Sequence, residues 1–419
     1  MMSGAKKMVP KRRFKEFLNA GDWELRKLGD VSNIIVGGTP STKVKVYWEP
    51  KEVPWMSSGE INKKRIYSTD NMISEYGLNN SNARWVKANS VLIALAGQGK
   101  TRGTVAINDI PLTTNQSIAA MELNKDFDAE FIFQNLNSRY EELRRVSSGD
   151  GTRGGLNKEI LSNFVVPYSI IDEQVEVGNF FRTIDNLIIR CQCKLDKLEA
   201  TKKALLQEMF PEEGQDIPKR RFKGFTDAWE QRKLGECMDS FEYGLNAAAK
   251  EYDGMHKYIR ITDIDDETHN FIQNNLTSPD IDFNSDVSDY KLNINDIVFA
   301  RTGASVGKTY LYNPNDGDLY YAGFLIRGKV NEACDAGFVY QNTLTGDYDS
   351  FIRITSQRSG QPGVNSKEYA TFRLNIPCKG EQEKISKLLS SLDKLFTLHQ
   401  RKLDKLKNLK QAYLNEMFV

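Results

Sequence analysis

Two glycine-rich segments of the sequence end in Lys-Thr, the residue types that bind nucleotide phosphates. A phosphate-binding loop needs four residues between its two glycines, whereas only three lie between Gly303 and Gly307, ahead of Lys308 and Thr309. The segment 97–101 lacks a first glycine at the required distance. Because the backbone cradle depends on the length of the loop, we expect no ATP site on this chain.

Other patterns of catalytic or metal-binding residues are equally incomplete. The string at 375–378, Asn-Ile-Pro-Cys, lacks the second proline and the aromatic residue of an adenine methyltransferase motif. The acidic run at 263–267 is more typical of a solvated loop than of a metal site. The five cysteines form no CxxC pair and leave an odd one over, and there are only three histidines. No zinc site is therefore expected, and the thiols fit a reducing cytoplasm. The sequence therefore predicts no catalytic residue and no metal on this chain.

Loops that carry short polar and basic side chains beside glycines are the strongest candidates for chemistry. Arg and Lys can bind guanine edges or phosphates, Gln can bind adenine, and Ser and Thr can bind either bases or phosphates. Surface turns often have this composition, so each loop alone is weak evidence. The candidate DNA contacts are Thr39, Ser41, Lys43, Ser57, Ser58, Gln98, Lys100, Thr101, Arg102, Arg153, Arg260, Thr262, Arg301, Thr302, Ser305, Lys308, Arg358 and Gln361.

The charge of the chain suggests that it would not hold DNA alone. The net charge is only +1, and 27% of the residues are charged. Residues 1–210 hold 30 Lys and Arg against 25 Asp and Glu, and the rest of the chain holds 27 against 31. A protein that gripped many phosphates by itself would usually be more basic, so partners are expected to supply part of the clamp. No long apolar run or signal-like segment stands out, and a cytoplasmic protein is expected.

An internal repeat organises the elements that must position these loops. Residues 10–15 return at 218–223, an offset of 208. Residues 173–210 align without a gap on 381–418 at the same offset, with 16 of 38 positions identical. The parts between these ends diverge. The chain is therefore a tandem duplication whose scaffold stayed alike while the middle of each copy changed, as expected for two domains of one fold that read different things.

The two repeated segments at 173–210 and 381–418 are predicted to be long helices. Apolar residues recur at alternating spacings of three and four, which keeps one seam towards a partner helix. Each helix would be roughly 57 Å long, and antiparallel pairing is the simplest arrangement; the alternative is that each helix packs on its own domain. Cys191, Lys202, His399 and Lys410 interrupt the seam as marks of register or exposure. The predicted seam residues are Val177, Phe181, Ile184, Ile188, Leu195, Leu198, Leu205, Ile385, Leu389, Leu392, Phe396, Leu403, Leu406 and Tyr413.

The segments between the helices are predicted to be two similar α+β domains. Residues 90–96 and 295–300 read as buried strands, and residues 128–146 and 335–354 as helices. We therefore expect two target-recognition domains joined by two long antiparallel helices, with an internal pseudo-two-fold repeat. The expected division is residues 1–169 for the first domain, 170–210 for the central helix, 211–378 for the second domain and 379–419 for the last helix.

Taken together, these motifs identify a family. The sequence resembles the specificity subunits of type I restriction-modification systems over nearly its whole length. The resemblance rests on Gly-Gly-Thr-Pro-Ser at 37–41, Tyr47-Trp48, Pro54-Trp55, residues 57–60 and residues 297–308. It also rests on the end of each domain, where Pro167 and Pro377 precede Glu173-Gln174 and Glu381-Gln382. The order of domain, helix, domain and helix is more specific than any of the motifs alone.

The resemblance implies a function that composition and spacing do not. Such subunits recognise a split, asymmetric DNA sequence, one half by each domain, and the helices act as a ruler for the unread gap. They recruit two methylation subunits, which carry S-adenosylmethionine, and two restriction subunits, which use ATP and Mg²⁺. Docking of the methylation subunits is implied for both helices and for residues 10–29 and 218–235.

One difference between the two domains qualifies this resemblance. The first domain has Leu95-Ala96-Gly97 where the second has Arg301-Thr302-Gly303, so a base-reading role shared by both domains is in doubt for Arg301. The competing hypotheses are a DNA-binding regulator that works without enzyme partners and, less favoured by loop spacing, a nucleotide-binding enzyme. Aspartate at Leu195 or Leu403 is expected to disturb domain spacing and partner assembly.

Overall fold

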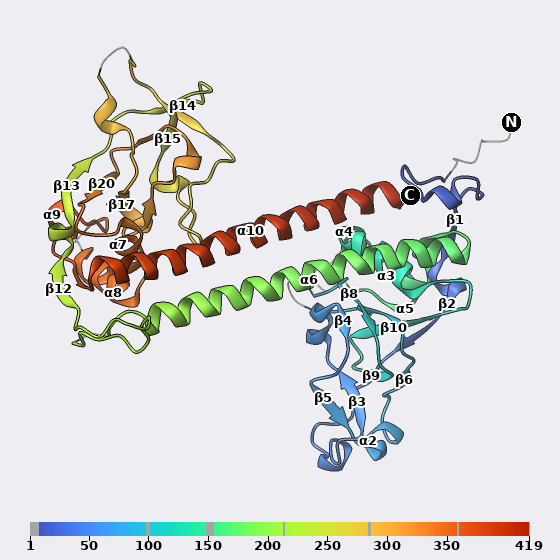
Figure 1. Cartoon of the computed structure of the whole chain (residues 1–419). Helices are drawn as coiled ribbons and strands as arrows, with labels where there is room; N and C mark the ends of the chain where they lie inside the picture. Colours follow the sequence, from blue (N-terminus) through green and yellow to red (C-terminus); the bar gives the residue numbers. More distant parts are fainter. Residues whose placement is uncertain are drawn as a thin grey trace. The chain divides into compact units, whose positions relative to one another are not determined.

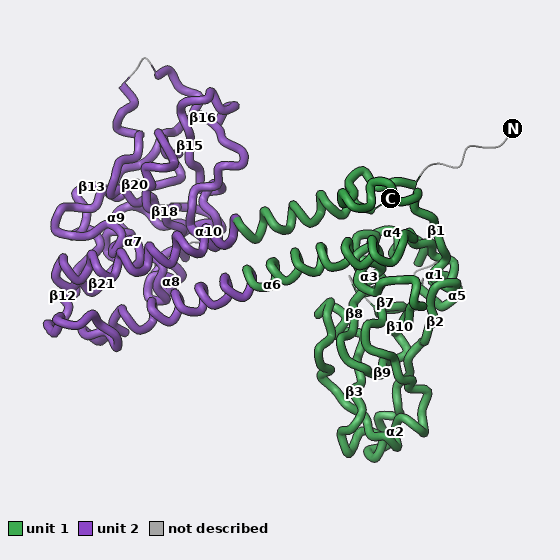
Figure 2. The backbone as a smooth tube through the Cα atoms, turned by 45° about the vertical axis from the view of Figure 1, so that its right-hand side comes forward, with its two compact units in different colours: residues 1–191, 402–419 green, residues 192–401 purple. Residues whose placement is uncertain are grey.

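A computed structural model describes residues 8–97, 101–147, 155–212, 214–283, 286–357 and 360–418. The chain divides into two compact units (Figure 2). Unit 1 consists of residues 1–191 together with 402–419, and unit 2 consists of residues 192–401. Each unit therefore combines one globular domain with parts of both long helices.

The predicted long helices are α6 (Ile171–Glu208) and α10 (Lys379–Met417), drawn in green and red in Figure 1. Within unit 1, the Phe180 and Tyr413 rings lie 5.0 Å apart and the Phe181 and Phe418 rings 5.7 Å apart. Further along, Lys410 Nζ lies 2.5 Å from Asp185 Oδ1. Numbers rise along one helix as they fall along the other, so the two run antiparallel, as predicted.

All fourteen predicted seam residues are buried or half-buried. The two lysines in the seam have partners: Lys410 pairs with Asp185 in unit 1, and Lys202 Nζ lies 2.6 Å from Asp393 Oδ1 in unit 2. The same two aspartates accept hydrogen bonds from Gln134 (2.7 Å) and Gln341 (2.9 Å) of the globular domains. Each lysine is thus part of a Gln–Asp–Lys chain that ties the helices to the domain of that unit.

Packing of each helix only on its own domain, the alternative arrangement, is not what the structure has. Val177 and Phe181 of α6 belong to the core of unit 1, whereas Met209 and Phe210 beyond its end belong to a core of unit 2. In the same way, Ile385 and Leu389 of α10 pack in unit 2 and Leu414 and Met417 in unit 1.

The domain of unit 1 is built on antiparallel and mixed sheets, with a short pair β1 (Glu24–Lys27) and β11 (Val165–Tyr168) beside them. The larger sheet has the order β2 (Ser32–Val36), β10 (Ile118–Leu123), β7 (Val91–Ala94), β8 (Val105–Asn108) and β4 (Arg65–Ile66). The smaller one has the order β5 (Asn71–Ile73), β3 (Val53–Met56), β9 (Leu112–Thr114) and β6 (Trp85–Val86). The helices of this domain are α1 (Leu28–Val31), α2 (Glu75–Asn79), α3 (Ala129–Ser138), α4 (Tyr140–Val146) and α5 (Lys158–Asn163).

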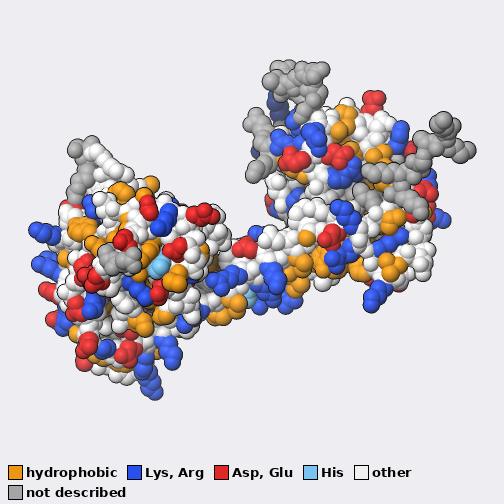
Figure 3. All heavy atoms as spheres, turned by 90° about the horizontal axis from the view of Figure 1, so that it is seen from above, with side chains coloured by type: hydrophobic (Ala, Val, Ile, Leu, Met, Phe, Trp, Pro, Cys, Tyr) orange, Lys and Arg blue, Asp and Glu red, His pale blue; other side chains and the backbone are white. Residues whose placement is uncertain are grey.

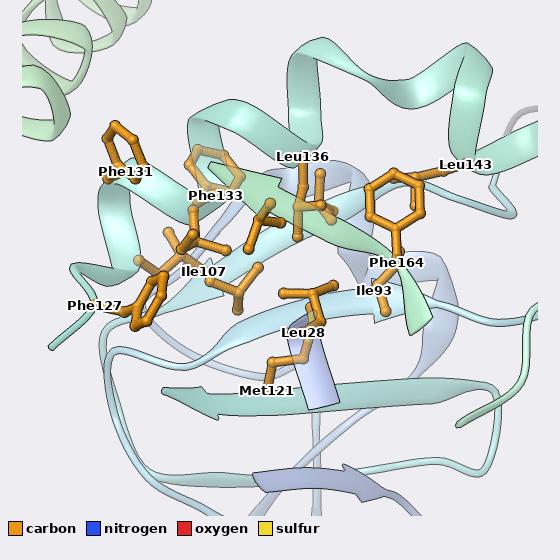
Figure 4. Close-up of a cluster of buried hydrophobic side chains, with 14 of the residues drawn as sticks. Leu28, Ile93, Ile107, Met121, Phe127, Phe131, Phe133, Leu136, Leu143 and Phe164 are labelled. Atoms are coloured by element: carbon orange, nitrogen blue, oxygen red, sulfur yellow. The ribbon is translucent and has the colours of Figure 1, made fainter. Parts of the chain in front are cut away.

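The core of unit 1 lies between the larger sheet and α3–α4 (Figure 4). Phe133, Leu136 and Leu143 point from the helices towards Ile93 and Ile107 of the sheet (Figure 4). These side chains are at most 3% exposed. Their burial removes apolar surface from water and fixes the helices on the face of the sheet that looks towards α6.

Unit 2 repeats this plan with its strands in smaller sheets. The antiparallel pair β12 (Glu230–Lys233) and β21 (Arg373–Ile376) corresponds to β1 and β11 of unit 1. The main sheet has the order β13 (Met238–Tyr243), β20 (Leu325–Val330), β17 (Asp296–Ala300) and β18 (Thr309–Leu311). The smaller pairs are β14 (Ala249–Glu251) with β16 (Thr277–Pro279) and β15 (Lys257–Ile259) with β19 (Leu319–Tyr321). The helices are α7 (Ala336–Asn342), α8 (Gly346–Thr355) and α9 (Ser366–Tyr369).

The single helices predicted at 128–146 and 335–354 are each broken in two. Arg139 leaves helical geometry with φ −100° and ψ 26°, and its guanidinium donates a 2.6 Å hydrogen bond to Val165 O. In unit 2, the hydroxyls of Thr343 and Thr345 donate to the carbonyls of Tyr340 and Asn342. The threonine hydroxyls compete with the helical ladder for these carbonyls. The prediction of continuous helices was wrong at both points.

The repeated Glu-Gln pair at the start of each long helix anchors the domain. Gln174 Oε1 accepts a hydrogen bond from Asp128 N (3.1 Å), and Gln382 Oε1 accepts one from Asp335 N (2.9 Å). Both aspartates cap the helix that follows, α3 and α7. The amide side chain therefore fixes the position of the domain helix against the first turn of the long helix.

The buried glutamates of these pairs bind the basic segments of each repeat. Arg13 contacts Glu173 through Nε (2.5 Å) and Nη2 (2.7 Å), and Arg221 contacts Glu381 through Nε (3.0 Å) and Nη2 (2.6 Å). The glutamate side chains are 1% and 0% exposed. These bidentate pairs explain why the segments at 10–15 and 218–223 were kept in both copies.

No helix within the described ranges is long and apolar enough to cross a membrane.

A half-buried lysine beside the helix pair gives unit 1 a pH-dependent stability. Burial lowers the pKa of Lys64 to about 8, and the nearby Lys410 lowers it further while Asp185 raises it. Lys64 Nζ donates a 2.8 Å hydrogen bond to Asn137 Oδ1. Below pH 8 the folded protein carries a buried charge that water would hold better, and between about pH 8 and the unperturbed pKa near 10.4 the unfolded chain binds more protons.

We therefore expect Lys64→Met to stabilise unit 1 by about 1–3 kcal/mol at pH 7, an advantage that shrinks as the pH rises through 8 to 10. Thermal unfolding of the variant and the parent at pH 7 and pH 9.5 checks the difference. Lys43→Met, at an exposed lysine of the same unit, should leave the stability unchanged at both pH values. A destabilised Lys64→Met at pH 7, or a constant difference between the two pH values, would contradict the assignment.

Candidate nucleic-acid interface

Several of the predicted DNA-contact loops in unit 1 meet at one end of the larger sheet. Gly37 N donates to Ile118 O (3.2 Å) and Gly38 N to Thr114 O (2.8 Å). Leu95 N donates to Ser117 O (2.8 Å), and Leu156 N donates to Leu95 O (2.9 Å). We call residues 37–43, 95–97, 101–102, 115–117 and 155–156 the first turn cluster. These backbone hydrogen bonds hold its loops together.

Close backbone contact explains the two glycines that precede Thr39. A Cβ atom on Gly37 would lie 2.2 Å from Thr114 O, and one on Gly38 would lie 2.3 Å from Asn82 C. These glycines therefore serve packing, and they bring the next residues to the surface. Thr39, Ser41 and Lys43 are exposed, and the Thr39 hydroxyl donates to Gln116 Oε1.

Ser57 and Ser58 lie beside this cluster, and polar groups of Ser57 already form hydrogen bonds within the protein. Asn115 N donates to Met56 O (3.0 Å), which places Ser57 next to the turn at 115–117. Ser57 caps the short helix η3 (Ser58–Lys63), and its backbone N–H donates to Glu60 Oε1 (2.9 Å). Both serines are half-buried. This capping role explains the presence of Ser57 without any contact with DNA.

The remaining predicted residues of unit 1 are Thr101 and Arg102, which are half-buried at the edge of the cluster. Gln98, Lys100 and Arg153 lie outside the described residues, as does Arg358 of unit 2.

Unit 2 builds the same frame from different residues. Gly244 N donates to Leu325 O (3.1 Å) and Leu245 N to Tyr321 O (2.9 Å). Arg301 N donates to Phe324 O (3.0 Å), and Val364 N donates to Arg301 O (2.9 Å). We call residues 243–245, 301–305, 322–324 and 361–364 the second turn cluster. The four hydrogen bonds match those of the first cluster one for one.

Four predicted residues come together in the second turn cluster. Thr302 forms an isolated bridge with Gly363, and Gly303 N donates to Pro362 O (3.0 Å). Gly303 has φ +75°, and a Cβ atom there would lie 3.0 Å from Gln361 Nε2. The frame thus brings the side chains of Arg301, Thr302, Ser305 and Gln361 to one end of the sheet.

Arg260, Thr262 and Lys308 are engaged elsewhere. Arg260 forms a bidentate pair with Asp263, at 2.8 Å from Nε and 2.9 Å from Nη2, and this hydrogen bonding raises the pKa of Arg260. Thr262 is exposed and donates to Asp263 Oδ1 (3.3 Å). Lys308 pairs with Asp266 and donates to Ile264 O (3.3 Å). All three side chains are bound to the acidic run at 263–267, which is therefore a partner of basic residues.

Sequence reasoning missed three exposed residues of the two clusters. Gln116 lies on the surface beside Thr39, and its signal was the polar run at 113–117 between two strands. Phe324 and Tyr243 are 60% and 42% exposed. The signal for Phe324 was the glycine before it, because a turn residue after glycine is presented at the surface.

The surface of each unit carries both signs of charge. On the face drawn in Figure 3, Lys and Arg side chains are interspersed with Asp and Glu over both units. This distribution agrees with the net charge of +1. It favours recognition by specific side chains over a broad phosphate-binding patch.

Among the described residues, no group of three or more His, Cys, Asp or Glu side chains could hold a metal ion. Gly303–Ser305 forms a single 3₁₀ turn. The lysine that would bind phosphate in a nucleotide loop, Lys308, is the one paired with Asp266.

Comparison with known proteins gives one family. A model of the type I restriction modification DNA specificity domain matches twice, at residues 20–200 and 226–408. The EcoR124I/EcoR124II specificity subunit of Escherichia coli is 28% identical over 42% of this chain, and the alignment spans only 44% of that relative's length. The MjaVIII specificity subunit of Methanocaldococcus jannaschii is 20% identical over 94% of this chain and 91% of its own.

The fold agrees with a solved structure. The type I restriction-modification S subunit from M. genitalium superposes with a TM-score of 0.68 at 15% identity, covering 98% of this chain and 99% of that one. The two family matches fall on the two copies of the repeat and together span most of the chain. This chain therefore belongs to the type I restriction modification DNA specificity family.

Proposed function

We propose that this chain is the DNA sequence-specificity subunit of a type I restriction-modification complex. The observation that carries the proposal is the pair of turn clusters, which share one backbone frame and differ in their exposed side chains. Two domains that share one fold but expose different side chains would suit a DNA target with two different halves. Membership of the specificity family supports the same function.

The chemistry of the complex is assigned to partner subunits. Two methylation subunits would supply S-adenosylmethionine and flip the target adenine out of the duplex, and two restriction subunits would supply ATP hydrolysis and Mg²⁺-dependent cleavage. This chain would act without catalysis of its own. The low net charge supports this division, because the partners would then provide much of the contact with phosphates.

The two long helices and the basic segments are the proposed docking surfaces for the methylation subunits. Leu187 of α6 and Leu395 of α10, which match at the offset of 208, are 38% and 44% exposed. Single exposed leucines are common on protein surfaces, so it is their recurrence at the same position of both repeats that supports a protein partner. The helices would also set the unread gap, since each is roughly 57 Å long, more than the ~34 Å of one DNA turn.

The test is to express this chain with its cognate methylation subunit and to map methylated adenines by single-molecule sequencing. The expected result is one motif with two short specific halves and a fixed gap. Exchange of residues 218–378 for those of a related chain should change one half and leave the other. An active complex with an unsplit motif would refute the two-reader architecture. If no complex formed, a DNA-binding regulator without enzyme partners would be the better explanation.

A further inference from the structure

The two turn clusters place different chemistry at matching positions. Leu95 and Arg301 match, because each donates its backbone N–H to the neighbouring turn, at 2.8 and 3.0 Å, and accepts a 2.9 Å hydrogen bond from the loop that follows. By the same hydrogen bonds, Ser117 matches Phe324. The second cluster therefore has a cation and an aromatic ring where the first has an aliphatic and a hydroxyl side chain.

The guanidinium of Arg301 is held in place but not neutralised. Its Cζ lies 4.9 Å from the centre of the Tyr243 ring, and Nη1 lies 3.4 Å from Gly323 O. The Tyr243 hydroxyl is itself fixed by Ser366, at 3.2 Å from its Oγ and 3.3 Å from its N. Arg260 and Arg327 of the same unit are paired with Asp263 and Glu242, whereas no carboxylate in the described part of the chain forms an ion pair with Arg301.

Phe324 is exposed on a turn that has little freedom to move. Gly323 N donates to Leu245 O (2.7 Å), Leu325 N to Ala322 O (2.8 Å), and Ala322 N to Ile259 O (3.0 Å). The ring is nevertheless 60% exposed. The turn keeps its shape through backbone bonds and does not need the ring, so the ring is available to an apolar surface of a partner.

We infer that Arg301 and Phe324 make unit 2 the reader of a half-site that contains a G·C pair next to a T. Arg301 would donate to guanine O6 and N7 in the major groove, and Phe324 would cover the neighbouring thymine methyl group. The matching positions in unit 1, Leu95 and Ser117, cannot make the bidentate contact with guanine. This inference rests on the proposed function and adds the base chemistry of one half of the target.

The test uses the residues of unit 1 as replacements in unit 2. Arg301→Leu and Phe324→Ser are each expressed with the methylation subunit, and the methylome is mapped as above. Arg301→Leu should lower methylation of the parental sites about 10- to 100-fold and relax one G·C position. The affected position should lie in the half that changes when residues 218–378 are exchanged. Phe324→Ser should weaken methylation at sites with the adjacent T and leave the G·C requirement in place.

Two further variants guard against a trivial loss of structure. Arg353→Leu, at an exposed arginine of α8 outside the cluster, should leave the motif unchanged. Arg301→Lys keeps the charge and loses the bidentate fork, so it should bind DNA and still relax the G·C position; it decides the question if Arg301→Leu does not fold. An unchanged split motif in the Arg301 variants would overturn this inference and leave the proposed function standing. A wild-type motif that is not split would instead refute the proposed function.

Discussion

Arg221→Ala should destabilise unit 2 by about 3–5 kcal/mol, because it leaves the carboxylate of Glu381 buried without its cation. That side chain is 0% exposed. Arg13→Ala should cost less in unit 1. Glu173 keeps hydrogen bonds from the Trp23 indole (3.0 Å) and the Ser169 hydroxyl, whereas in unit 2 the Trp229 indole nitrogen is buried and has no partner within the described residues.

Urea unfolding with hydrogen exchange resolved by segment measures the two effects separately. The exposed neighbours Arg12 and Arg220, paired with Glu416 and Glu208, provide matched controls whose alanine variants should leave the stability nearly unchanged. Adding Glu381→Gln to Arg221→Ala should restore part of the loss, because the buried charge is removed. A loss below about 1 kcal/mol for Arg221→Ala would contradict the role given to this pair.

Aspartate in the helix seam should be more damaging still. Phe181 and Leu389 match at the offset of 208, and both are fully buried. Removing a buried large side chain costs about 2–5 kcal/mol, and the buried charge adds to it. We expect Phe181→Asp and Leu389→Asp to lose at least about 4 kcal/mol each and to fail to assemble with the methylation subunit.

The exposed leucines at 187 and 395 supply the controls on the same helices. Their aspartate variants should remain within about 1 kcal/mol of the parent in stability. Thermal unfolding and size-exclusion chromatography with the methylation subunit separate the two readouts. Folded, fully assembled Phe181→Asp and Leu389→Asp proteins would show that neither unit depends on the helix seam for its own stability. Folded but unassembled Leu187→Asp or Leu395→Asp proteins would map the docking surface.

The long helices could be predicted because their signal is local and repeated. Apolar residues at heptad spacing, such as Phe181 and Leu389, mark the buried side wherever the helix runs. The breaks at Arg139 and at Thr343 could not be predicted in this way. They depend on hydrogen bonds to Val165 and to carbonyls one turn back, and the apolar pattern continues through both.

The candidate interface was less accessible to sequence reasoning. Its loops meet through backbone hydrogen bonds between distant residues, such as Leu95 with Ser117, and backbone atoms leave no trace in residue types. Composition also cannot distinguish an arginine without a carboxylate partner from one that is paired with a carboxylate of the same chain. Arg260 and Arg301 look alike in the sequence, but Arg260 meets Asp263 three residues later and Arg301 meets the ring of Tyr243.

The exchange of helix ends between the units has a consequence for the origin of the molecule. Leu414 and Met417, from the second repeat, complete the core of unit 1, and Met209 and Phe210, from the first repeat, complete a core of unit 2. A chain with a single repeat would therefore lack part of its own core and could gain it only from a second copy. Two identical copies would present two identical turn clusters. In a single chain each turn cluster can change by itself, which agrees with the different residues at the matching positions Leu95 and Arg301.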